Sequence, residues 1–466
     1  MKYRNCVLLL LFLSVIVAAP SGPAPVLGDK QSAEKDEALK KSKDEDEFYE
    51  LFRLFADTLD QVERNYVNDI SRRELMEAAI QGVVSKLDQH SNYIAPSELE
   101  EFRIDVEAEF GGIGISFSKP SKKDWLQVIS PIAGSPAYRA GILAGDLITH
   151  IEDTPTNELE RKETVRRIKG KLGTKVRLTV RHLDRTSEKI EVERQIIRVE
   201  TVLGDTRNED ASWDFMLDDE NKIGYIRLAA FARHTTSDLR KVLEKLQSEK
   251  MNGLILDLRN NPGGLLSSAI QISDMFVAEG RIVSTSGRNV EDKRWDERRR
   301  GTYSDFPMLV LVNNYSASAS EIVAACLQDH DRAIVVGERT YGKGSVQNII
   351  ELEQGRSALK LTTAQYFRPS GKNIHRFKGA TEKDEWGVLP NSGWNVKLTR
   401  AETMHLAMER HSRDAIRKEY KKPDGVTDKV LIKALSHLAK LVGEDTPAVV
   451  GDANEKDKAS DTETPN

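Results

Sequence analysis

Residues 314–347 read Asn-Tyr-Ser-Ala-Ser-Ala-Ser-Glu-Ile-Val-Ala-Ala-Cys-Leu-Gln-Asp-His-Asp-Arg-Ala-Ile-Val-Val-Gly-Glu-Arg-Thr-Tyr-Gly-Lys-Gly-Ser-Val-Gln, and this stretch decides the fold. Its small residues lead into an apolar helix that begins at about Ser318, because Ser318 and Glu321 match a capping box. An apolar strand, residues 332–337, follows, and the glycine-rich turn after it carries Lys343. The stretch therefore offers a candidate serine nucleophile at a helix start and a candidate lysine base in a later turn.

The chemistry of a helix start favours Ser318 as the nucleophile. The first N–H groups of the helix, that of Ala319 among them, have no partner within the helix and would stabilise a developing oxyanion. No Gly-x-Ser-x-Gly elbow and no histidine-bearing turn lies nearby, so the base would be Lys343. Burial would have to lower the lysine pKa from about 10.4 to near neutrality. Gln347, four positions further on, could hold the ammonium by a hydrogen bond.

The same residues allow simpler interpretations. A Ser-x-x-Glu pattern is often only a helix cap, and a lone lysine in a turn is usually a solvated charge. Gly337-x-x-x-x-Gly342-Lys343 also resembles the start of a phosphate-binding P-loop. The P-loop pattern fails because Gly344 stands where the magnesium-binding Ser or Thr belongs, and because residues 345–350 read as a strand.

Composition sets the class of protein. The 466 residues suffice for two or three domains, and 39% hydrophobic with 31% charged residues are typical of a globular protein. A net charge of −5 argues against nucleic-acid binding. Cys6 and Cys326 offer no disulfide framework, and Cys326 is expected to pack in the core. The histidines are scattered without metal-ligand spacing, so no metal site is predicted.

The two ends of the chain differ from the rest. Residues 1–28 have a basic start and a short apolar run followed by small residues, which indicates an export signal and a periplasmic or secreted protein. An uncleaved anchor is the alternative, and membrane association is expected only in that case. Residues 29–46 are charged, with almost nothing to bury, and are predicted to be a linker; residues 445–466 are acidic and are predicted to be disordered.

Two regions show helical periodicity. Residues 47–108 carry an apolar stripe that begins at Phe48, and a second helix is expected from Ser71. Residues 401–444 form a C-terminal helical region rich in Ala and Leu towards its end. Apolar stripes on short helices would also suit the surface of a homodimer.

Residues 109–190 have the texture of a small strand-rich domain. Gly112, Ile113, Gly114 and Ile115 form a glycine loop that leads into a strand, and a Ser-Pro-Ala helix and a Gly-Asp turn follow. This order resembles a PDZ domain. The resemblance implies a groove that takes a polypeptide C-terminus by strand addition, with the backbone N–H groups of this loop holding the carboxylate.

Residues 191–400 read as an α/β core. The apolar run 253–258 suits a buried strand, and it leads into a sharp Asn-Asn-Pro-Gly-Gly turn that ends at Gly264. The glycines allow close backbone approach, so Gly263 or Gly264 could supply a second oxyanion donor. Another buried strand, residues 308–312, delivers the chain to Ser318.

In combination, these segments resemble the C-terminal processing (tail-specific) peptidases, serine proteases with a Ser-Lys dyad. Besides the PDZ-like segment, the motifs that carry the resemblance are residues 257–264, 315–322, 336–347 and 361–371. The resemblance implies a multidomain α+β protein: an N-terminal helical segment, a PDZ domain, an α/β protease core of the crotonase-like type and a helical C-terminal region.

By the same resemblance, Ser318 is the nucleophile, Lys343 the general base and Gln347 the residue that orients the lysine. Ala319 and Gly264 are the oxyanion donors that the family pattern favours. The resemblance implies an endopeptidase that selects exported proteins by their C-terminal tails, with no metal or cofactor and with an activating adaptor as a further partner. The alternative is a catalytically silent PDZ-bearing scaffold.

The sequence departs from the family pattern at two places. Lys169 stands where many relatives carry an arginine at the end of the PDZ helix, which places gating through a bidentate contact there in question. Residues 375–386 look like a charged insertion that would alter the wall of the cleft.

Overall fold

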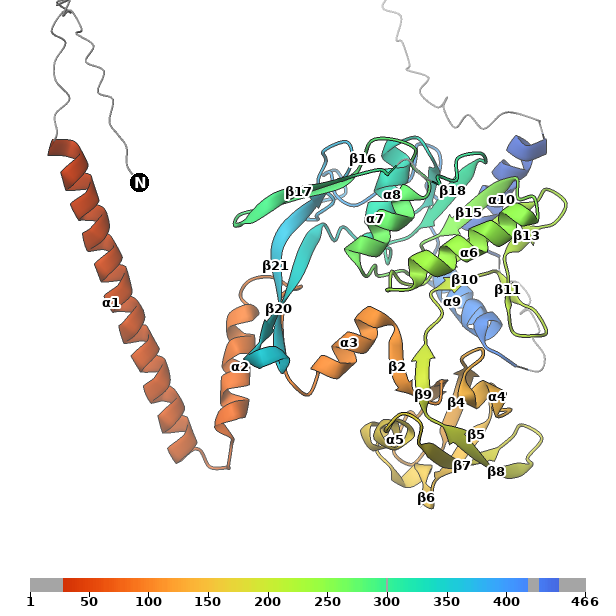
Figure 1. Ribbon diagram of the computed structural model, residues 1–466, viewed down its shortest axis with the longest axis horizontal. Helices are drawn as coiled ribbons and strands as arrows, with labels where there is room; N and C mark the ends of the chain where they lie inside the picture. The colour runs from red at the N-terminus through yellow and green to blue at the C-terminus, as the bar shows by residue number, and fades with distance from the viewer. Residues whose placement is uncertain (1–27, 299–300, 418–426, 444–466) are drawn as a thin grey trace, which may run out of the picture. The chain divides into compact units, whose positions relative to one another are not determined.

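The computed structural model describes residues 28–298, 301–417 and 427–443 (Figure 1). The expected export signal, apart from Gly28, and the acidic tail 445–466 lie outside these ranges, as does Cys6. Across the described ranges, none of the helices combines the length and apolar character that a membrane crossing requires. The chain falls into two compact units, Met1–Ile80 and Gln81–Asn466.

The described part of the first unit is mainly helical. Helix α1 spans Gly28–Asn65, and α2 (Arg72–Val84) runs across the boundary between the units. Residues 29–46, which the sequence suggested as a charged linker, are helical and belong to α1. Their Ala, Lys and Glu residues are strong helix formers, so a segment with little to bury can still be helical. The apolar stripe of α1 is exposed at Phe48, Tyr49, Leu51, Phe52, Leu54 and Phe55.

The second unit contains a PDZ-like sheet. Its strand order is β3-β4-β5-β7-β8, with β6 beside β5, and Ile113, Leu126, Ile148 and Val176 lie in its core. Strands β2 and β9 pair antiparallel and form the entrance and exit of this segment. The elements are β2 (Glu109–Gly112), β3 (Ile115–Ser118), β4 (Leu126–Pro131), α4 (Pro136–Arg139), β5 (Leu147–Ile151), β6 (Thr154–Pro155), η1 (Thr156–Glu158), α5 (Arg161–Ile168), β7 (Lys175–Arg181), β8 (Ser187–Glu193) and β9 (Gln195–Arg198).

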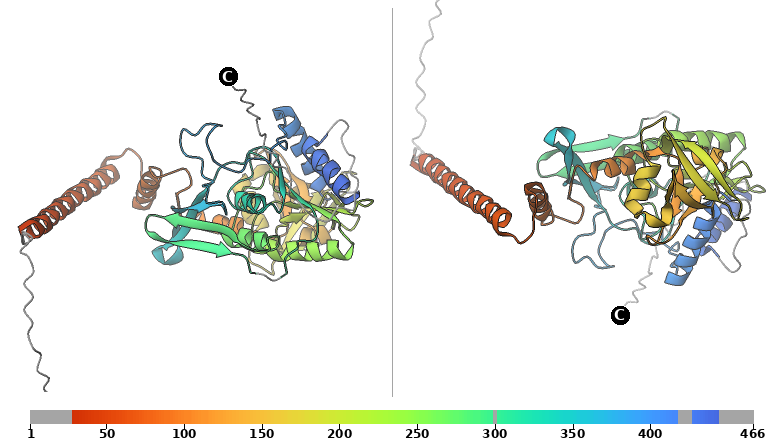
Figure 2. Two further views of the ribbon diagram at one scale, coloured as in Figure 1. Left: turned by 90° about the horizontal axis from the view of Figure 1, so that it is seen from above. Right: turned by 90° about the horizontal axis from the view of Figure 1, so that it is seen from below.

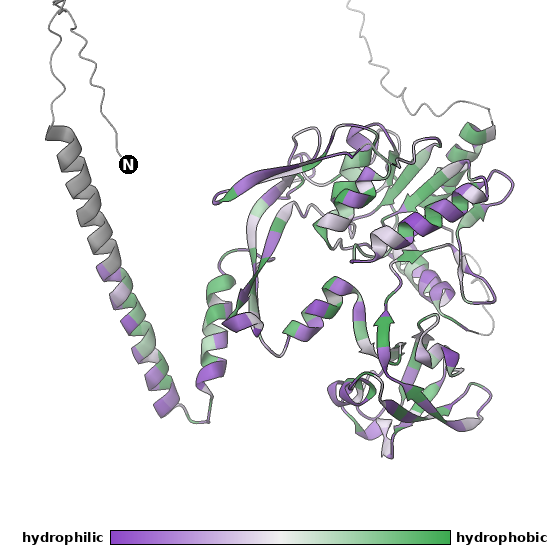
Figure 3. Ribbon diagram, in the orientation of Figure 1, coloured by the Kyte–Doolittle hydropathy of each residue, from purple (hydrophilic) through white to green (hydrophobic). Residues whose placement is uncertain are grey.

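The central sheet of the unit has the order β10-β14-β15-β18-β19, with β13 beside β14. Strands β14, β15, β18 and β19 run parallel, and every residue of β15 and β18 is buried. The strands of this sheet are largely green in Figure 3, the colour of hydrophobic residues. The strands are β10 (Val202–Leu203), β13 (Met216–Asp218), β14 (Ile223–Leu228), β15 (Gly253–Asp257), β18 (Met308–Val312) and β19 (Ile334–Gly337). A small pair, β11 (Thr206–Arg207) and β12 (Trp213–Asp214), lies outside this sheet.

Helices cover both faces of the central sheet (Figure 1). On one face lie α6 (Thr235–Ser248), α7 (Leu266–Asp274) and α8 (Ala319–Asp329), and on the other lies α10 (Lys429–Gly443). The C-terminal region that was expected to be helical contains α9 (Arg400–Asp414) and α10, which Figure 2 shows in blue. Val430, Ala434 and Leu438 of α10 are buried against the sheet, so this helix is part of the protease core.

A second sheet has the order β1-β21-β16-β17, with β20 beside β21. Its strands are β1 (Asn92–Ile94), β16 (Arg281–Gly287), β17 (Val290–Asp296), β20 (Ser345–Leu352) and β21 (Ser357–Phe367), and η2 (Glu353–Gly355) joins the last two. The region 47–108, expected to be helical, therefore contains a strand before α3 (Leu99–Glu107). This strand forms because Asn92–Ile94 pairs antiparallel with β21, a partner that is remote in the sequence.

Candidate active site

Ser318 lies at the sharp turn between β18 and α8. It is the N-cap of α8, as predicted, with φ 56° and ψ −114°, values that a residue with a side chain seldom adopts. Such strain persists only where the surroundings hold it, and it is typical of a nucleophile presented at a strand-to-helix turn.

The hydroxyl groups of the three neighbouring serines have different environments. Ser316 Oγ donates to Leu258 O at 2.8 Å, and Ser320 Oγ donates to Asn261 O at 2.9 Å. Both hydroxyls thus hold the turn in place. The Ser318 side chain instead hydrogen-bonds with Tyr366, a neighbour whose pKa burial raises to about 12. Of the three, Ser318 is the hydroxyl that is not bound to a backbone carbonyl within the described residues.

The glycine turn after β15 lies against the nucleophile. A Cβ on Gly263 would come within 2.7 Å of Ala317 O and 2.9 Å of Ala319 N, so only glycine fits there. Gly263 N–H donates to Asn261 Oδ1 at 2.9 Å and is therefore occupied. Among the described residues, the N–H groups of Gly264 and Ala319 have no hydrogen-bond partner. These are the two donors that the sequence indicated.

Lys343 lies in the turn between β19 and β20 and is half-buried. Burial lowers the pKa of its amine, and the charge of Lys360 lowers it further, whereas Glu321 and Asp88 raise it. The start of the segment 375–386 lies against this turn. Arg376 N–H donates to Gly342 O at 2.8 Å, and a Cβ on Gly344 would meet His375 N at 2.3 Å.

Glu321 connects the serine turn to the lysine turn. Its fully buried carboxylate accepts Ser318 N–H at 2.8 Å and Lys343 N–H at 2.8 Å. It also accepts Gly342 N–H and Thr340 Oγ1–H, each at 2.6 Å. Burial raises the pKa of Glu321 to about 7, although all four hydrogen bonds favour the ionised form. The sequence predicted this residue only as a helix cap.

Within the described residues, the hydrogen bonds of the Gln347 side chain go to Ser345 and Thr362 and not to Lys343. Its amide nitrogen donates to Ser345 Oγ at 2.8 Å and to Thr362 Oγ1 at 3.1 Å, which leaves Oε1 as the atom that can hold an ammonium. Within the described part of the chain, no hydrogen bond joins the Lys343 amine to Ser318 or to Gln347. Catalytic hydrogen bonds often form only when substrate binds, so the lack of a Ser318–Lys343 hydrogen bond here does not argue against a dyad.

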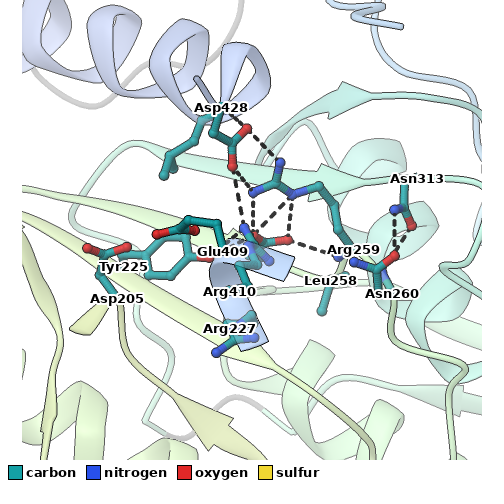
Figure 4. A network of polar contacts seen from close by, with 12 residues as sticks. Asp205, Tyr225, Arg227, Leu258, Arg259, Asn260, Asn313, Glu409, Arg410 and Asp428 are labelled. Carbon is teal, nitrogen blue, oxygen red and sulfur yellow. Dashed lines mark hydrogen bonds and ion pairs between the residues drawn. The ribbon is translucent and has the colours of Figure 1, made fainter. Parts of the chain in front are cut away.

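A buried ionic network lies at the start of the glycine turn, where β15 ends (Figure 4). The sequence analysis did not predict it. Asp257, the last residue of β15, accepts from Arg259, Arg410 and Tyr225, each at 2.7 Å. Asp428 accepts from Arg259 at 2.8 and 2.9 Å. Burial alone would raise the pKa of Asp257, but the two guanidinium groups hold it far below its usual range. Arg410 and Asp428 come from the C-terminal region, so no local pattern could indicate them.

The predicted peptide-binding loop leads into an edge strand. Gly112 ends β2, Ile113 is buried, Gly114 has φ 82°, and Ile115 begins β3 at the edge of the PDZ sheet. A Cβ on Gly114 would lie 2.3 Å from Ser135 Cβ, so this position requires glycine. An edge strand can pair with an added peptide strand.

The end of the PDZ helix α5 is held by an arginine from elsewhere in the domain. Arg194 donates to the carbonyl oxygens of Arg167 at 2.7 Å and of Ile168 and Lys169 at 3.0 Å each. The Lys169 amine lies 6.0 Å from the centre of the Phe110 ring. The Lys169 amine therefore lies near Phe110 at the start of the domain. The C-terminal end of α5 is held by Arg194.

Two other expectations from the sequence concern cysteine and metals, and the first is confirmed: Cys326 is buried, and burial raises the pKa of its thiol to about 12. Such a thiol is inert at neutral pH. Across the described ranges, no group of three or more His, Cys, Asp or Glu side chains could hold a metal ion.

Family models match three parts of the chain. Residues 222–385 match peptidase family S41, residues 127–182 match the PDZ domain, and residues 23–96 match the N-terminal domain of the activating protease CtpB. Among solved structures, a photosystem II D1 C-terminal processing protease is similar at 26% identity and a TM-score of 0.42, over 74% of this chain and 92% of that one.

Two bacterial relatives match most of the chain. A carboxy-terminal-processing protease of Bartonella bacilliformis is 39% identical over 333 residues, which is 70% of this chain and 73% of the relative. The carboxy-terminal processing protease CtpA of Bacillus subtilis is 30% identical over 425 residues, 86% of this chain and 84% of the relative. These matches confirm the predicted family resemblance and fold class. The chain therefore belongs to the carboxy-terminal processing proteases of peptidase family S41, which are serine proteases.

Proposed function

We propose that Ser318 and Lys343 form the catalytic dyad of this protease. The neutral Lys343 amine accepts the Ser318 proton as Oγ attacks the scissile carbonyl, and the N–H groups of Ala319 and Gly264 stabilise the oxyanion. Lys343 then donates the proton to the leaving amine, and water releases the acyl group from Ser318. Gln347 holds the ammonium through Oε1 while the lysine carries the proton.

One observation carries this assignment. The Glu321 carboxylate accepts the backbone N–H groups of Ser318 and Lys343, each at 2.8 Å, and so keeps the two turns in fixed register. A group that fixes both residues supports their joint action, because nucleophile and base must meet with defined geometry. Because the chain belongs to a family of serine proteases, the alternative of a catalytically silent PDZ-bearing scaffold is not supported.

We infer that the substrates are polypeptides selected by their C-termini. The names of the relatives point to carboxy-terminal processing. The loop at Gly112, Ile113 and Gly114 and the edge strand that begins at Ile115 would take an apolar tail by strand addition. The export-signal pattern of residues 1–28 favours periplasmic or secreted substrates.

Two further partners are proposed. The exposed apolar stripe of α1, from Phe48 to Phe55, would suit a second copy of this chain, whereas α10 already buries its apolar face against the central sheet. The match of residues 23–96 to the N-terminal domain of an activating protease is consistent with an adaptor that regulates the enzyme.

The test uses the purified protein and an unfolded substrate that ends in a few apolar residues, compared with the same substrate ending in acidic ones. Wild type should cleave the apolar-tailed substrate faster, and Ser318→Ala and Lys343→Ala should be inert. Ser320→Ala is the matched control. It removes a hydroxyl that holds the turn, so its rate should fall by no more than about tenfold. A dyad variant that retains wild-type activity would refute the assignment.

A further inference from the structure

The segment just before β1 reaches the lysine side of the active site. Its charged residue is Asp88, whose Oδ1 accepts the N–H groups of His90 at 2.7 Å and Ser91 at 2.9 Å. Ser91 Oγ donates to Asp88 Oδ2 at 2.8 Å. The carboxylate is thus held in one orientation by its own turn.

Thr362 of β21 connects this turn to the active site. Strand β1 pairs with residues 358–360 of β21, and β16 pairs with residues 365–367, so Thr362 lies in the interval between them. Its N–H donates to Ser91 Oγ at 3.0 Å, and its hydroxyl donates to Asp88 Oδ1 at 3.3 Å. On the other edge of β21, Thr362 faces Gln347 of β20.

The direction of these hydrogen bonds fixes the Gln347 amide. Because the Asp88 carboxylate only accepts, the Thr362 hydroxyl must donate to it and presents a lone pair to Gln347. The amide nitrogen of Gln347 donates to that oxygen at 3.1 Å. This orientation directs Oε1 away from Thr362 and leaves it free for an ammonium.

We propose that Asp88 is a positioning residue of the active site, whose carboxylate orients Gln347 through Thr362 and places a negative charge near the Lys343 amine. This inference rests on the proposed role of Lys343 as the general base. It assigns a part in the reaction to the segment that precedes β1, well outside residues 222–385, which match the peptidase family.

The charge of Asp88 acts on Lys343 in a known direction. Burial raises the pKa of Asp88, but the hydrogen bonds from His90, Ser91 and Thr362 outweigh it, so the carboxylate stays ionised. That charge raises the pKa of Lys343 against the lowering by burial. The charged and titratable groups around this cluster are Asp88, His90, Glu321, Lys360 and His375.

The first test is the pH dependence of kcat/KM for Asp88→Asn. Asparagine keeps Oδ1 for the two backbone N–H groups but removes the charge, so the neutral lysine is favoured and the rising limb of the profile should move to lower pH. The matched control is Asp218→Asn, because Asp218 accepts two backbone N–H groups, of Glu220 and Asn221, at 3.0 Å each in the same way, away from Lys343. Its profile should coincide with that of wild type.

A rising limb of Asp88→Asn that coincides with the wild-type limb would overturn the proposal, whatever the change in kcat. The midpoint of the limb does not depend on the amount of active enzyme, so partial unfolding leaves the comparison valid. If Ser318→Ala and Lys343→Ala are inert but the rising limb of Asp88→Asn coincides with that of wild type, only the inference about Asp88 fails. If Lys343→Ala remains active, the proposed dyad itself fails.

A second pair of variants tests the hydrogen-bond chain without changing any charge. Thr362→Val removes the hydroxyl between Asp88 and Gln347 and should lower kcat by about fivefold with little change in KM, since one hydrogen bond contributes roughly 1 kcal/mol. Thr362→Ser retains the hydroxyl and should stay within about twofold of wild type. Equal kcat values for Thr362→Val and wild type would exclude the chain.

Discussion

Glu321 shows how one buried side chain can organise a catalytic site. It is the N3 residue of the capping box of α8, which the sequence predicts, and the same carboxylate accepts two N–H groups from the lysine turn. A buried carboxylate is costly unless hydrogen bonds compensate it, and here four donors do so. The geometry of the dyad therefore depends on a residue that takes no part in bond making.

We expect Glu321→Gln to lower kcat by about ten- to a hundredfold. The amide has a single acceptor oxygen, so at least one N–H of the two turns loses its partner, at a cost of about 1–3 kcal/mol. The matched control is Glu402→Gln in the exposed capping box of α9, where Glu402 accepts Thr399 N–H at 2.7 Å. Steady-state kinetics on both variants decide the matter: equal kcat values would contradict the role of Glu321.

The same residue makes stability depend on pH. Burial raises the pKa of Glu321 from an ordinary 4.5 to about 7, so between these values the folded chain keeps a proton that the unfolded chain has lost. This contribution to stability is complete below about pH 4.5 and is lost as the pH rises through about 7. Urea unfolding should show that the free energy of unfolding of wild type falls between about pH 5 and about pH 8. The corresponding fall for Glu321→Gln should be smaller. Parallel decreases for the two proteins would contradict the assignment.

At the scale of elements, α9 and α10 complete the support of the glycine turn. Arg410 of α9 and Asp428, just before α10, close the network around Asp257 and Arg259. The turn from Arg259 to Gly264 starts from this network, and Asn260 and Asn313 exchange two hydrogen bonds, at 3.0 and 2.9 Å, that fix it to the end of β18. The C-terminal helices are thus coupled to the proposed oxyanion site.

Arg410→Met should lower the free energy of unfolding by about 3–5 kcal/mol, because it leaves a buried carboxylate without one of its partners. Arg400→Met is the matched control: the same change on the same helix at an exposed position should stay within about 0.5 kcal/mol. Chemical denaturation measures both variants. A loss for Arg410→Met no larger than for Arg400→Met would show that the network does not stabilise the fold.

At the scale of the whole second unit, the PDZ sheet is connected to the end of α9. Ile416 N–H donates to Ser130 Oγ at 3.0 Å, and Ala144 N–H donates to Ile416 O at 3.1 Å. Two residues earlier, Asp414 accepts from Arg227 of β14 at 2.7 Å. The segment that follows α9 therefore contacts the PDZ domain directly after the helix that carries Arg410.

Ser130→Ala should speed amide hydrogen exchange at Ile416 and Ala144 by about fivefold, since a lost hydrogen bond makes local opening roughly 1 kcal/mol easier. Ser187→Ala, at an exposed position on β8 of the same domain, should leave both amides unchanged. Exchange measured by NMR or mass spectrometry would contradict the contact if the two variants behaved alike.

The sequence predicted the dyad candidates, the order of elements in the PDZ domain and the buried strands, because each of these gives a recognisable pattern in neighbouring residues. The residues it missed share a different property. Glu321 connects two turns, and Asp88 reaches β21. Arg410 binds Asp257 and Asp428 binds Arg259, and both contacts join segments that are far apart in the sequence. Such contacts depend on tertiary packing, and no spacing in one sequence encodes them.

The position of Arg410 and Asp428 near the end of the chain has a consequence for the timing of protein synthesis. Earlier segments leave the ribosome first, so the strand that ends at Asp257 is made well before its charge partners from the C-terminal region. Until those helices emerge, one face of the central sheet lacks the cover of Val430 and Leu438 and the glycine turn lacks its full support. We therefore expect the proposed oxyanion site to reach its final geometry only after α9 and α10 have been made and have folded.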